Sequence, residues 1–152
     1  MFCQDASFND LRRALGKASL AQHMDAERRG VPSFAAEALR DALGISIKRF
    51  ASIIGTPAST YRRRIRDYDG SFSGSQALAI LGVLELINLV DDLTDPLYVA
   101  DSRFVAARWF GEWIERPQPV LGGFQPEEFL DTPTGRQEVK RLLGGISSSA
   151  FL

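Results

Sequence analysis

The sequence predicts an all-α protein in which a helix-turn-helix domain precedes a second, smaller helical domain. Three observations support this prediction. Apolar residues recur at i, i+3, i+4 and i+7 in successive segments, glycine and proline separate those segments, and no segment shows the alternation of a half-buried strand. The chain has 152 residues, of which 45% are hydrophobic and 24% charged, a composition typical of an ordinary globular protein.

The first predicted element is a helix within residues 7–29, where Phe8, Leu11 and Leu15 lie at helical spacing. The glycine and proline of the motif GVPS, which follows this segment, begin a new unit. We therefore assign residues 1–29 to an N-terminal helical segment. We expect this segment to be one of two candidate contacts between subunits.

Two helices with clear ends come next. Residues 34–43 end at Gly44, a position where glycine commonly takes the left-handed conformation that stops a helix. Residues 45–54 begin with Ser46 as the N-cap. They carry one apolar stripe at helical spacing, formed by Ile47, Phe50, Ala51 and Ile54.

A third helix begins at Thr56 and Pro57 and extends to about Asp67. A capping hydroxyl followed by proline is a strong start signal, because the missing N–H of proline costs nothing in the first turn. With the preceding helix and the glycine between them, this helix completes a helix-turn-helix pattern. Tyr61 and Ile65 are four residues apart, so both should face the core.

A long apolar helix follows the loop DGSFSGS, covers residues 77–90 and ends near Asp91. It is shorter than the ~20 residues that a membrane span needs, and Glu85 and Asn88 interrupt it. We therefore expect a central buried helix and no membrane contact. Part of its surface is the second candidate contact between subunits. Residues 30–92 are assigned to the helix-turn-helix domain.

Residues 93–152 are assigned to the second domain. We expect a helix over residues 102–115, the Pro/Gly-rich loop RPQPVLGGFQP, one helical turn at PEEFLD, and a last helix. That last helix begins at a second Thr-Pro pair, at Thr132. The pair Gly144–Gly145 should end it, which leaves SSSAFL as a flexible tail.

Charge is distributed unevenly along the chain, whose formal net charge is −1. Residues 1–43 carry equal numbers of basic and acidic residues. Residues 44–68 carry six Lys or Arg and one Asp, a net charge of +5, and residues 69–152 carry six basic and twelve acidic residues, a net charge of −6. This asymmetry predicts two surfaces with different partners.

The basic charge is concentrated on the third helix, in the motif STYRRRIRD. In helix-turn-helix docking the second helix enters the major groove. Arginine can grip guanine with its forked guanidinium or neutralise phosphate. Because Tyr61 and Ile65 face the core, the opposite face of this helix points outward, with a flank beside it. The preceding helix carries two more cations in its first turn, Lys48 and Arg49. The predicted DNA-binding residues are Lys48, Arg49, Ser59, Thr60, Arg62, Arg63, Arg64 and Arg66. The competing interpretation is a solvated basic face without a ligand.

Residues that support catalysis are scarce. His23 and Cys3 are the only histidine and cysteine, so neither a metal-ligand spacing nor a Ser-His-Asp set can be built. We therefore expect no enzyme, no cofactor and no small-molecule substrate. Residues 1–13 lack the basic start and apolar run of a signal peptide, and a single cysteine excludes a disulfide framework. We expect a cytoplasmic protein.

Two stretches resemble a known family. LGISIKRFASIIGTPASTYRRRI is similar to the helix-turn-helix of the Xre-type antitoxins, the group with MbcA and ParS that partners RES-domain toxins. ARWFGEWIERPQPVLGGFQPEEFLDTPTGRQEVKRLLGGI is similar to the toxin-binding region of the same family. The ordered set that carries this second resemblance is Trp113-Ile114, Leu121 to Gly123, Pro126, Leu130 to Thr132, Gly135 and Val139.

The resemblance implies a type II antitoxin that binds and silences a cognate RES toxin, an enzyme acting on NAD, and that represses their shared promoter. The predicted toxin-binding residues are Trp109, Trp113, Leu121, Gly122, Gly123, Phe124, Ile146, Ser149, Phe151 and Leu152. For the tryptophans, which are four residues apart, the competing interpretation is that they pack the core. We hypothesise that the tail enters the toxin's cofactor pocket, which must handle the phosphates of NAD and so should be electropositive. The competing interpretation is a frayed terminus.

A palindromic operator requires a dimer, so we expect a homodimer formed by the long apolar helix or by the N-terminal segment. Two other functions remain open. The first is a stand-alone helix-turn-helix regulator whose second half senses a small molecule. A toxin gene next to the gene for this chain would argue against that function. The second is a protein-interaction module whose basic helix does not bind DNA, which a salt-dependent gel shift would reveal.

Overall fold

The computed structural model describes Phe2, residues 7–94 and residues 105–149. Within these ranges all regular secondary structure is helical apart from one short pair of strands, so the all-α prediction is confirmed. The α-helices are α1 (Phe8–Lys17), α2 (Leu20–Arg29), α3 (Ser33–Leu43), α4 (Ile47–Ile54), α5 (Ala58–Arg66), α6 (Gly74–Leu93), α7 (Ala106–Trp113) and α8 (Pro133–Ser149). The 3₁₀ helices are η1 (Pro119–Leu121) and η2 (Pro126–Phe129), and the strands are β1 (Val31–Pro32) and β2 (Ser71–Phe72).

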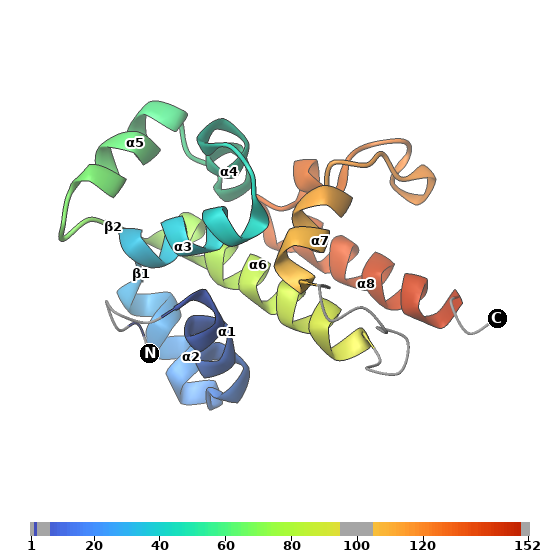
Figure 1. The fold of residues 1–152 in the computed structure, drawn as a ribbon, viewed down its shortest axis with the longest axis horizontal. Helices are drawn as coiled ribbons and strands as arrows, with labels where there is room; N and C mark the ends of the chain where they lie inside the picture. The colour runs from blue at the N-terminus through green and yellow to red at the C-terminus, as the bar shows by residue number, and fades with distance from the viewer. Residues whose placement is uncertain (1, 3–6, 95–104, 150–152) are drawn as a thin grey trace.

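Helix α6 runs through the middle of the molecule, with the other helices arranged around it (Figure 1). It contacts α1, α2, α4, α7 and α8. Most of its apolar side chains are buried, among them Ile80, Val83 and Ile87, so the prediction of a central buried helix is confirmed. The subunit's own helices cover most of this apolar surface, and its role as a contact between subunits stays a prediction. No helix in the described part of the chain is long and apolar enough to cross a bilayer.

The N-terminal segment is a hairpin of two helices, so the prediction of one helix over residues 7–29 is wrong. The chain is extended at Ala18 and Ser19, and Ser19 caps α2 by exchanging hydrogen bonds with Gln22. This capping box satisfies two backbone donors that a continuous helix would not need to cap. The break lets both helices pack against α6, with Leu11 and Leu15 of α1 fully buried.

The helix ends around α4 agree with the sequence prediction. Gly44 and Gly55 both have positive φ, in the left-handed conformation that ends α3 and α4. The hydroxyl of Ser46 accepts a hydrogen bond from the backbone N–H of Arg49 at 3.2 Å, which confirms Ser46 as the N-cap of α4. The helix-turn-helix is therefore formed by α4 and α5.

Thr56 does not cap α5, contrary to the prediction. Its backbone N–H donates to the carbonyl oxygen of Ala51 at 2.9 Å, which makes Thr56 the closing residue of the turn after α4. Pro57 is then the residue before α5. The Oγ1 atom of Thr56 is buried without a hydrogen-bond partner among the described residues. At the second Thr-Pro pair the prediction is confirmed, because Thr132 Oγ1 accepts from the N–H of Gly135 at 3.1 Å.

A short antiparallel pairing joins the two ends of the helix-turn-helix region. Val31 pairs with Phe72, and Pro32 with Ser71. The sequence predicts no strand here and a loop at DGSFSGS. Two residues are too few to show a period-2 pattern, so this pairing could only be seen in three dimensions.

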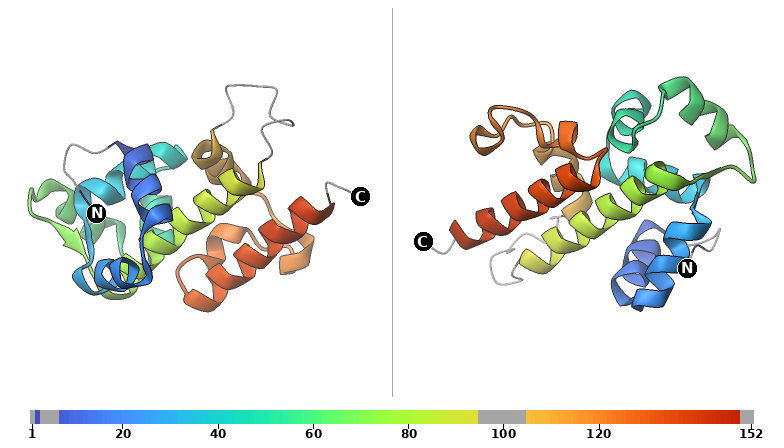
Figure 2. Two further views of the ribbon diagram at one scale, coloured as in Figure 1. Left: turned by 90° about the horizontal axis from the view of Figure 1, so that it is seen from below. Right: turned by 180° about the vertical axis from the view of Figure 1, so that it is seen from behind.

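The second domain packs on the first through two of its helices. α7 lies against α3, and α8 lies alongside α6 (Figure 2). The contact between α7 and α3 requires glycine at Gly111, since a Cβ there would collide with the carbonyl oxygen of Leu43. The predicted helix over 102–115 is α7, with residues 102–104 outside the described ranges. The predicted helical turn at PEEFLD is confirmed as η2.

Helix α8 continues to Ser149, so the prediction that Gly144–Gly145 ends it is wrong. Neither glycine has a positive φ, the conformation through which a glycine stops a helix. A glycine inside a helix costs only about 1 kcal/mol relative to alanine. Packing of Val139 and Leu143 into the core is enough to offset such a cost. The serines at 147–149 are therefore helical and are not part of a flexible tail.

Candidate functional sites

Tyr61 sets the orientation of α5 on the rest of the molecule. Its ring is fully buried between Phe50, in an edge contact with centroids 5.5 Å apart, and Phe72, in a stacked contact at 5.3 Å. Its hydroxyl donates to Oε2 of Glu37 on α3 at 2.6 Å. Because Tyr61 holds one face of α5 inward, the opposite face is turned to solvent, as the spacing of Tyr61 and Ile65 predicts.

Glu37 is the polar centre of this contact. Arg40 donates to both of its carboxylate oxygens, at 2.6 and 3.0 Å, and to the carbonyl oxygen of Ile45 at 2.9 Å. Burial by itself raises the pKa of Glu37, but the hydrogen bonds from Arg40 and Tyr61 outweigh it and leave that pKa below its ordinary value. Burial, followed by the bond to Glu37, raises the pKa of the Tyr61 phenol. The network thus ties α3, α5 and the start of α4 together.

Replacing Tyr61 with phenylalanine is expected to lower the free energy of unfolding by about 1.5 kcal/mol. This is the lower end for a hydrogen bond to a charged group, because Glu37 is partly exposed. The bond lowers the folded-state pKa of Glu37, so its contribution is present above the ordinary pKa of 4.5 and is lost as the pH falls through the lower, folded value. Denaturant unfolding at pH 7 and at pH 3 measures the difference in free energy of unfolding between the wild-type chain and Tyr61→Phe. This difference should be smaller at pH 3, and an equal difference at both pH values would contradict the prediction.

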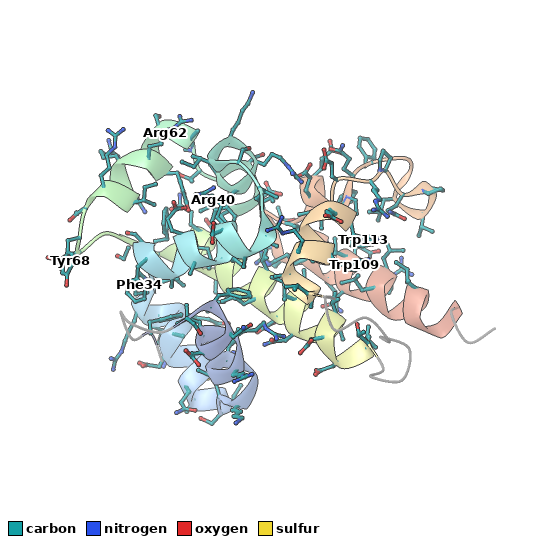
Figure 3. The ribbon with its side chains drawn as sticks, viewed as in Figure 1. Phe34, Arg40, Arg62, Tyr68, Trp109 and Trp113 are labelled. Atoms are coloured by element: carbon teal, nitrogen blue, oxygen red, sulfur yellow. The ribbon has the colours of Figure 1, made fainter. Side chains whose placement is uncertain are left out.

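The outward face of α5 carries the cations that the sequence assigned to it. The side chains of Arg62, Arg63 and Arg66 are exposed, and none of these side chains has a hydrogen bond or ion pair with another residue in the described ranges. Figure 3 shows Arg62 on the outer side of α5. Ser59 and Lys48 are exposed as well. We call these five residues the basic face: each can meet a phosphate or a base without breaking a contact within the protein.

Arg64 and Arg49, also predicted to bind DNA, are engaged within the protein. Nη1 of Arg64 donates to the carbonyl oxygen of Ser71 and to Gln76, and its guanidinium lies 5.5 Å from the ring centroid of Phe72. Arg64 therefore fastens α5 to β2 and α6. Arg49 contacts the second domain. Thr60, on the flank of α5, is half-buried.

The two tryptophans lie on one face of α7 (Figure 3). Their rings stack with centroids 5.8 Å apart and planes inclined by 13°. Trp113 is 5% exposed and belongs to the core, whereas Trp109 is half-buried at its edge. A direct contact of Trp113 with a partner would require the core to open, so the core interpretation applies to Trp113.

The Pro/Gly-rich loop forms a turn that presents apolar side chains to solvent. Gly122 and Gly123 both have positive φ, a conformation that glycine adopts without steric cost. The turn is closed by two hydrogen bonds between Gln118 and the backbone of Gly123 and Phe124. Val120 is 68% and Phe124 55% exposed, so both side chains can be reached by a partner.

Beside this turn lies a groove of about 410 Å³ between the loop and α8. Its apolar walls are Val120 and Leu121 from the loop and Leu142 and Ile146 from α8, and its polar rim includes Gln118, Glu138 and Arg141. The groove brings the predicted residues Leu121 and Ile146 together, although 25 positions separate them in the sequence. We call it the loop–α8 groove.

Some of the predicted toxin-binding residues are not part of this groove. Phe124 is not among the residues that line the groove. Its ring makes an edge contact with the ring of Phe129, with ring centroids 6.3 Å apart. The side chain of Ser149 and all of Phe151 and Leu152 lie outside the described residues. Val120 and Leu142 line the groove but were not among the predicted toxin-binding residues. The signal for Val120 was an apolar residue in a Pro/Gly-rich loop, and the signal for Leu142 was its helical spacing from Ile146, four residues later.

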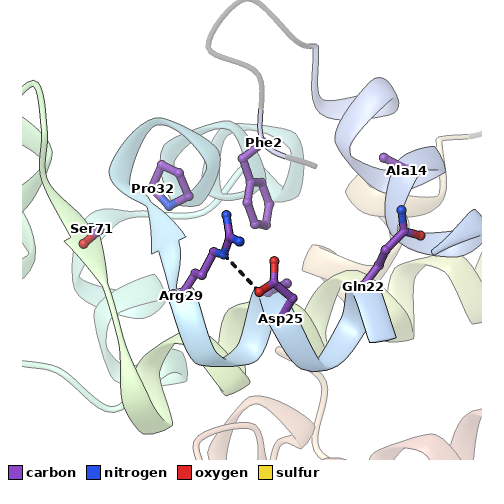
Figure 4. A pocket seen from close by; sticks show the side chains of 9 residues that line it. Phe2, Ala14, Gln22, Asp25, Arg29, Pro32 and Ser71 are labelled. Carbon is purple, nitrogen blue, oxygen red and sulfur yellow. Dashed lines mark hydrogen bonds and ion pairs between the residues drawn. The ribbon is translucent and has the colours of Figure 1, made fainter. Parts of the chain in front are cut away.

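A second cavity, of about 500 Å³, lies at the N-terminal hairpin and is lined by residues that include Phe2, Gln22 and Pro32. Arg29 in its wall is paired with Asp25 at 3.0 Å (Figure 4), so the charges there already satisfy each other. Within the described ranges, no three His, Cys, Asp or Glu side chains are grouped in a way that could hold a metal ion.

Comparison with known proteins identifies both parts of the chain. Residues 22–84 match the antitoxin Xre-like helix-turn-helix domain, and residues 99–148 match the antitoxin Xre/MbcA/ParS C-terminal toxin-binding domain. The chain is also similar to a protein of Sphingobium sp. (strain YBL2) named "Prs ADP-ribosylating antitoxin". The two are 27% identical over 139 residues, which cover 91% of this chain and 86% of that protein. The first range includes the basic face, and the second includes the loop–α8 groove.

Proposed function

The chain belongs to the Xre/MbcA/ParS antitoxin family, and we propose that it neutralises a cognate RES-domain toxin through its second domain while α4 and α5 repress the operon that encodes both. The name of the Sphingobium relative links it to ADP-ribosylation, a reaction in which ADP-ribose is taken from NAD. A toxin that consumes NAD is the corresponding partner of this chain. The chain itself supplies binding surfaces and no catalysis.

The loop–α8 groove is the observation that carries the proposal for toxin binding. It lies within the range that matches the toxin-binding domain, and Val120 in its wall and Phe124 at the end of the same turn are exposed. Interfaces of this kind derive most of their affinity from a few apolar anchors that are fully desolvated on binding. In this proposal an apolar side chain of the toxin binds in the groove, and Phe124 binds in a pocket of the toxin.

Charge supports the same assignment. Residues 69–152 carry a net charge of −6, and a pocket that holds the pyrophosphate of NAD is expected to be positively charged. Opposite charges speed association and orient the partners. The blocking of the toxin's active site by the last residues of the chain stays a prediction, because Phe151 and Leu152 lie outside the described residues.

Phe124→Ala is expected to weaken toxin binding by about 2 kcal/mol or more, the threshold for an interface hot spot, which is roughly 30-fold in Kd. Phe124 is mostly exposed in the free chain, so the variant should keep its fold. The Kd is measured with the purified product of the neighbouring gene, and relief of growth arrest on co-expression is the parallel readout in cells.

Val105→Ala is the matched control for this variant, since Val105 is exposed to a similar degree but lies neither in the Pro/Gly-rich loop nor in the wall of the groove. Equal affinities of the wild-type chain and Phe124→Ala would remove the loop from the toxin interface. If the wild-type chain bound its promoter but not the neighbouring gene's product, it would be a stand-alone regulator.

We propose that the chain acts as a homodimer in the cytoplasm, where its operator lies. Two-fold related half-sites are read by two-fold related helices. Of the two candidate contacts we favour the N-terminal hairpin, because most of the apolar surface of α6 is covered within the subunit. On α2 the side chains of Leu20 and Met24 are four residues apart and exposed, which gives the hairpin an outward apolar strip.

A further inference from the structure

Arg49 connects the helix-turn-helix to the toxin-binding domain. It lies in the first turn of α4, and each of its three guanidinium nitrogens has a partner across the domain boundary. Nε donates to Oε2 of Glu127 at 3.1 Å. Nη2 donates to the carbonyl oxygen of Gly111 at 3.3 Å. Nη1 lies 3.8 Å from Oε2 of Glu115. The guanidinium thus has no nitrogen without a protein partner.

The environment of this contact makes it stronger than an ordinary surface ion pair. The side chain of Arg49 is 29% exposed and that of Glu127 only 15%, so solvent screens the pair less than it screens an exposed one. Both backbones are fixed. The N–H of Arg49 is bound to Ser46, and the N–H of Glu127 is bound to the carbonyl oxygen of Ile114 at 3.1 Å.

Arg49 lies on the helix of the motif that crosses the phosphate backbone in helix-turn-helix complexes, and it follows directly after Lys48, which belongs to the basic face. In the free chain its guanidinium is turned to the second domain, where Glu127 holds Nε and the carbonyl oxygen of Gly111 holds Nη2. A phosphate that engaged Nε would have to displace the Glu127 carboxylate. The ion pair therefore competes with a phosphate contact of Arg49.

We propose that Glu127, assisted by Glu115, withholds Arg49 from the operator, so that an ion pair to the toxin-binding domain restrains the DNA affinity of the helix-turn-helix. This inference rests on the proposed binding of operator DNA. Glu127 lies in η2, three residues after Phe124, so the restraint is located beside the turn where the toxin is proposed to dock. Arg49 is then a reserve phosphate contact that the free chain does not use.

The experiment measures the salt dependence of operator binding for the full chain and four variants. Each phosphate contact contributes about −0.9 to the slope of log K against log [salt]. In Glu127→Gln, which keeps the shape of the side chain and removes its charge, the slope should steepen by about 0.9. In Arg49→Ala it should equal the wild-type slope, and in the double variant it should return to that value. Glu112→Gln is the matched control, because Glu112 is exposed on α7 and loses the same charge.

The outcomes separate this inference from the function on which it rests. A slope for Glu127→Gln equal to that of Glu112→Gln would overturn the restraint, and so would a shallower slope for Arg49→Ala, which would mean that Arg49 already contacts phosphate. If the wild-type chain did not bind its operator at all, the proposed repression itself would fail. Should Glu127→Gln unfold, Glu115→Gln takes its place, since Glu115 is exposed; its slope should steepen by less than that of Glu127→Gln, and an unchanged slope would overturn the proposal.

Discussion

Replacing Arg62 and Arg63 together with alanine is expected to lower operator affinity by about 1–3 kcal/mol for each of the two that grips a guanine. Both side chains are exposed, and neither has a partner among the described residues. The folded chain should therefore lose no internal contact. The loss appears as a higher Kd in fluorescence anisotropy with a labelled promoter fragment.

The single variants divide this loss by mechanism. An arginine that grips guanine should relax specificity at one base pair, whereas one that binds phosphate should weaken all sequences equally and reduce the salt slope by about 1. Arg28→Ala is the matched control, because Arg28 is an exposed arginine on α2. A double variant that bound the promoter as tightly as Arg28→Ala would show that the basic face is only a solvated surface. Toxin binding should be unchanged in all of these variants.

Trp113→Ala is expected to lower the free energy of unfolding by about 3–5 kcal/mol, the usual cost of truncating a large aromatic side chain in a core. Trp113 is 5% exposed, stacks on Trp109 and lies against Phe110 with ring centroids 6.1 Å apart. Since a typical domain is stable by only roughly 5–15 kcal/mol, toxin binding should fall because the domain unfolds. Denaturant unfolding measures the change in stability.

Trp109→Ala separates packing from recognition on the same helix. Trp109 is half-buried, so its truncation should cost less stability than that of Trp113. If Trp113→Ala kept its full stability and still lost the toxin, Trp113 would be a binding residue despite its burial. Loss of operator binding together with toxin binding in Trp113→Ala would agree with global unfolding, because α7 packs on α3 of the first domain.

The errors of the sequence prediction have two causes. The continuation of α8 through two glycines depends on packing against the rest of the molecule, whereas the closing role of Thr56 and the break between α1 and α2 rest on local hydrogen bonds. Ser19 and Gln22 did carry a capping signal, which was overlooked within an apparently continuous pattern. For Gly144 and Gly145 no local signal distinguishes the end of a helix from a helix that continues, since glycine is compatible with both.

The sequence alone determined the helical class, the ends of α3 and α4, the inward face of α5 and the family. The first three depend on caps and spacings within about four residues, where hydrogen bonds and side-chain periodicity act locally. The family depends on an ordered set of residues from Trp113 to Val139. Only the tertiary structure decided which arginines are available to DNA, which tryptophan is core, and where the apolar groove lies. Arg49 meets Glu127 across 78 positions, and contacts at such separations follow from how helices pack around α6, not from any local pattern.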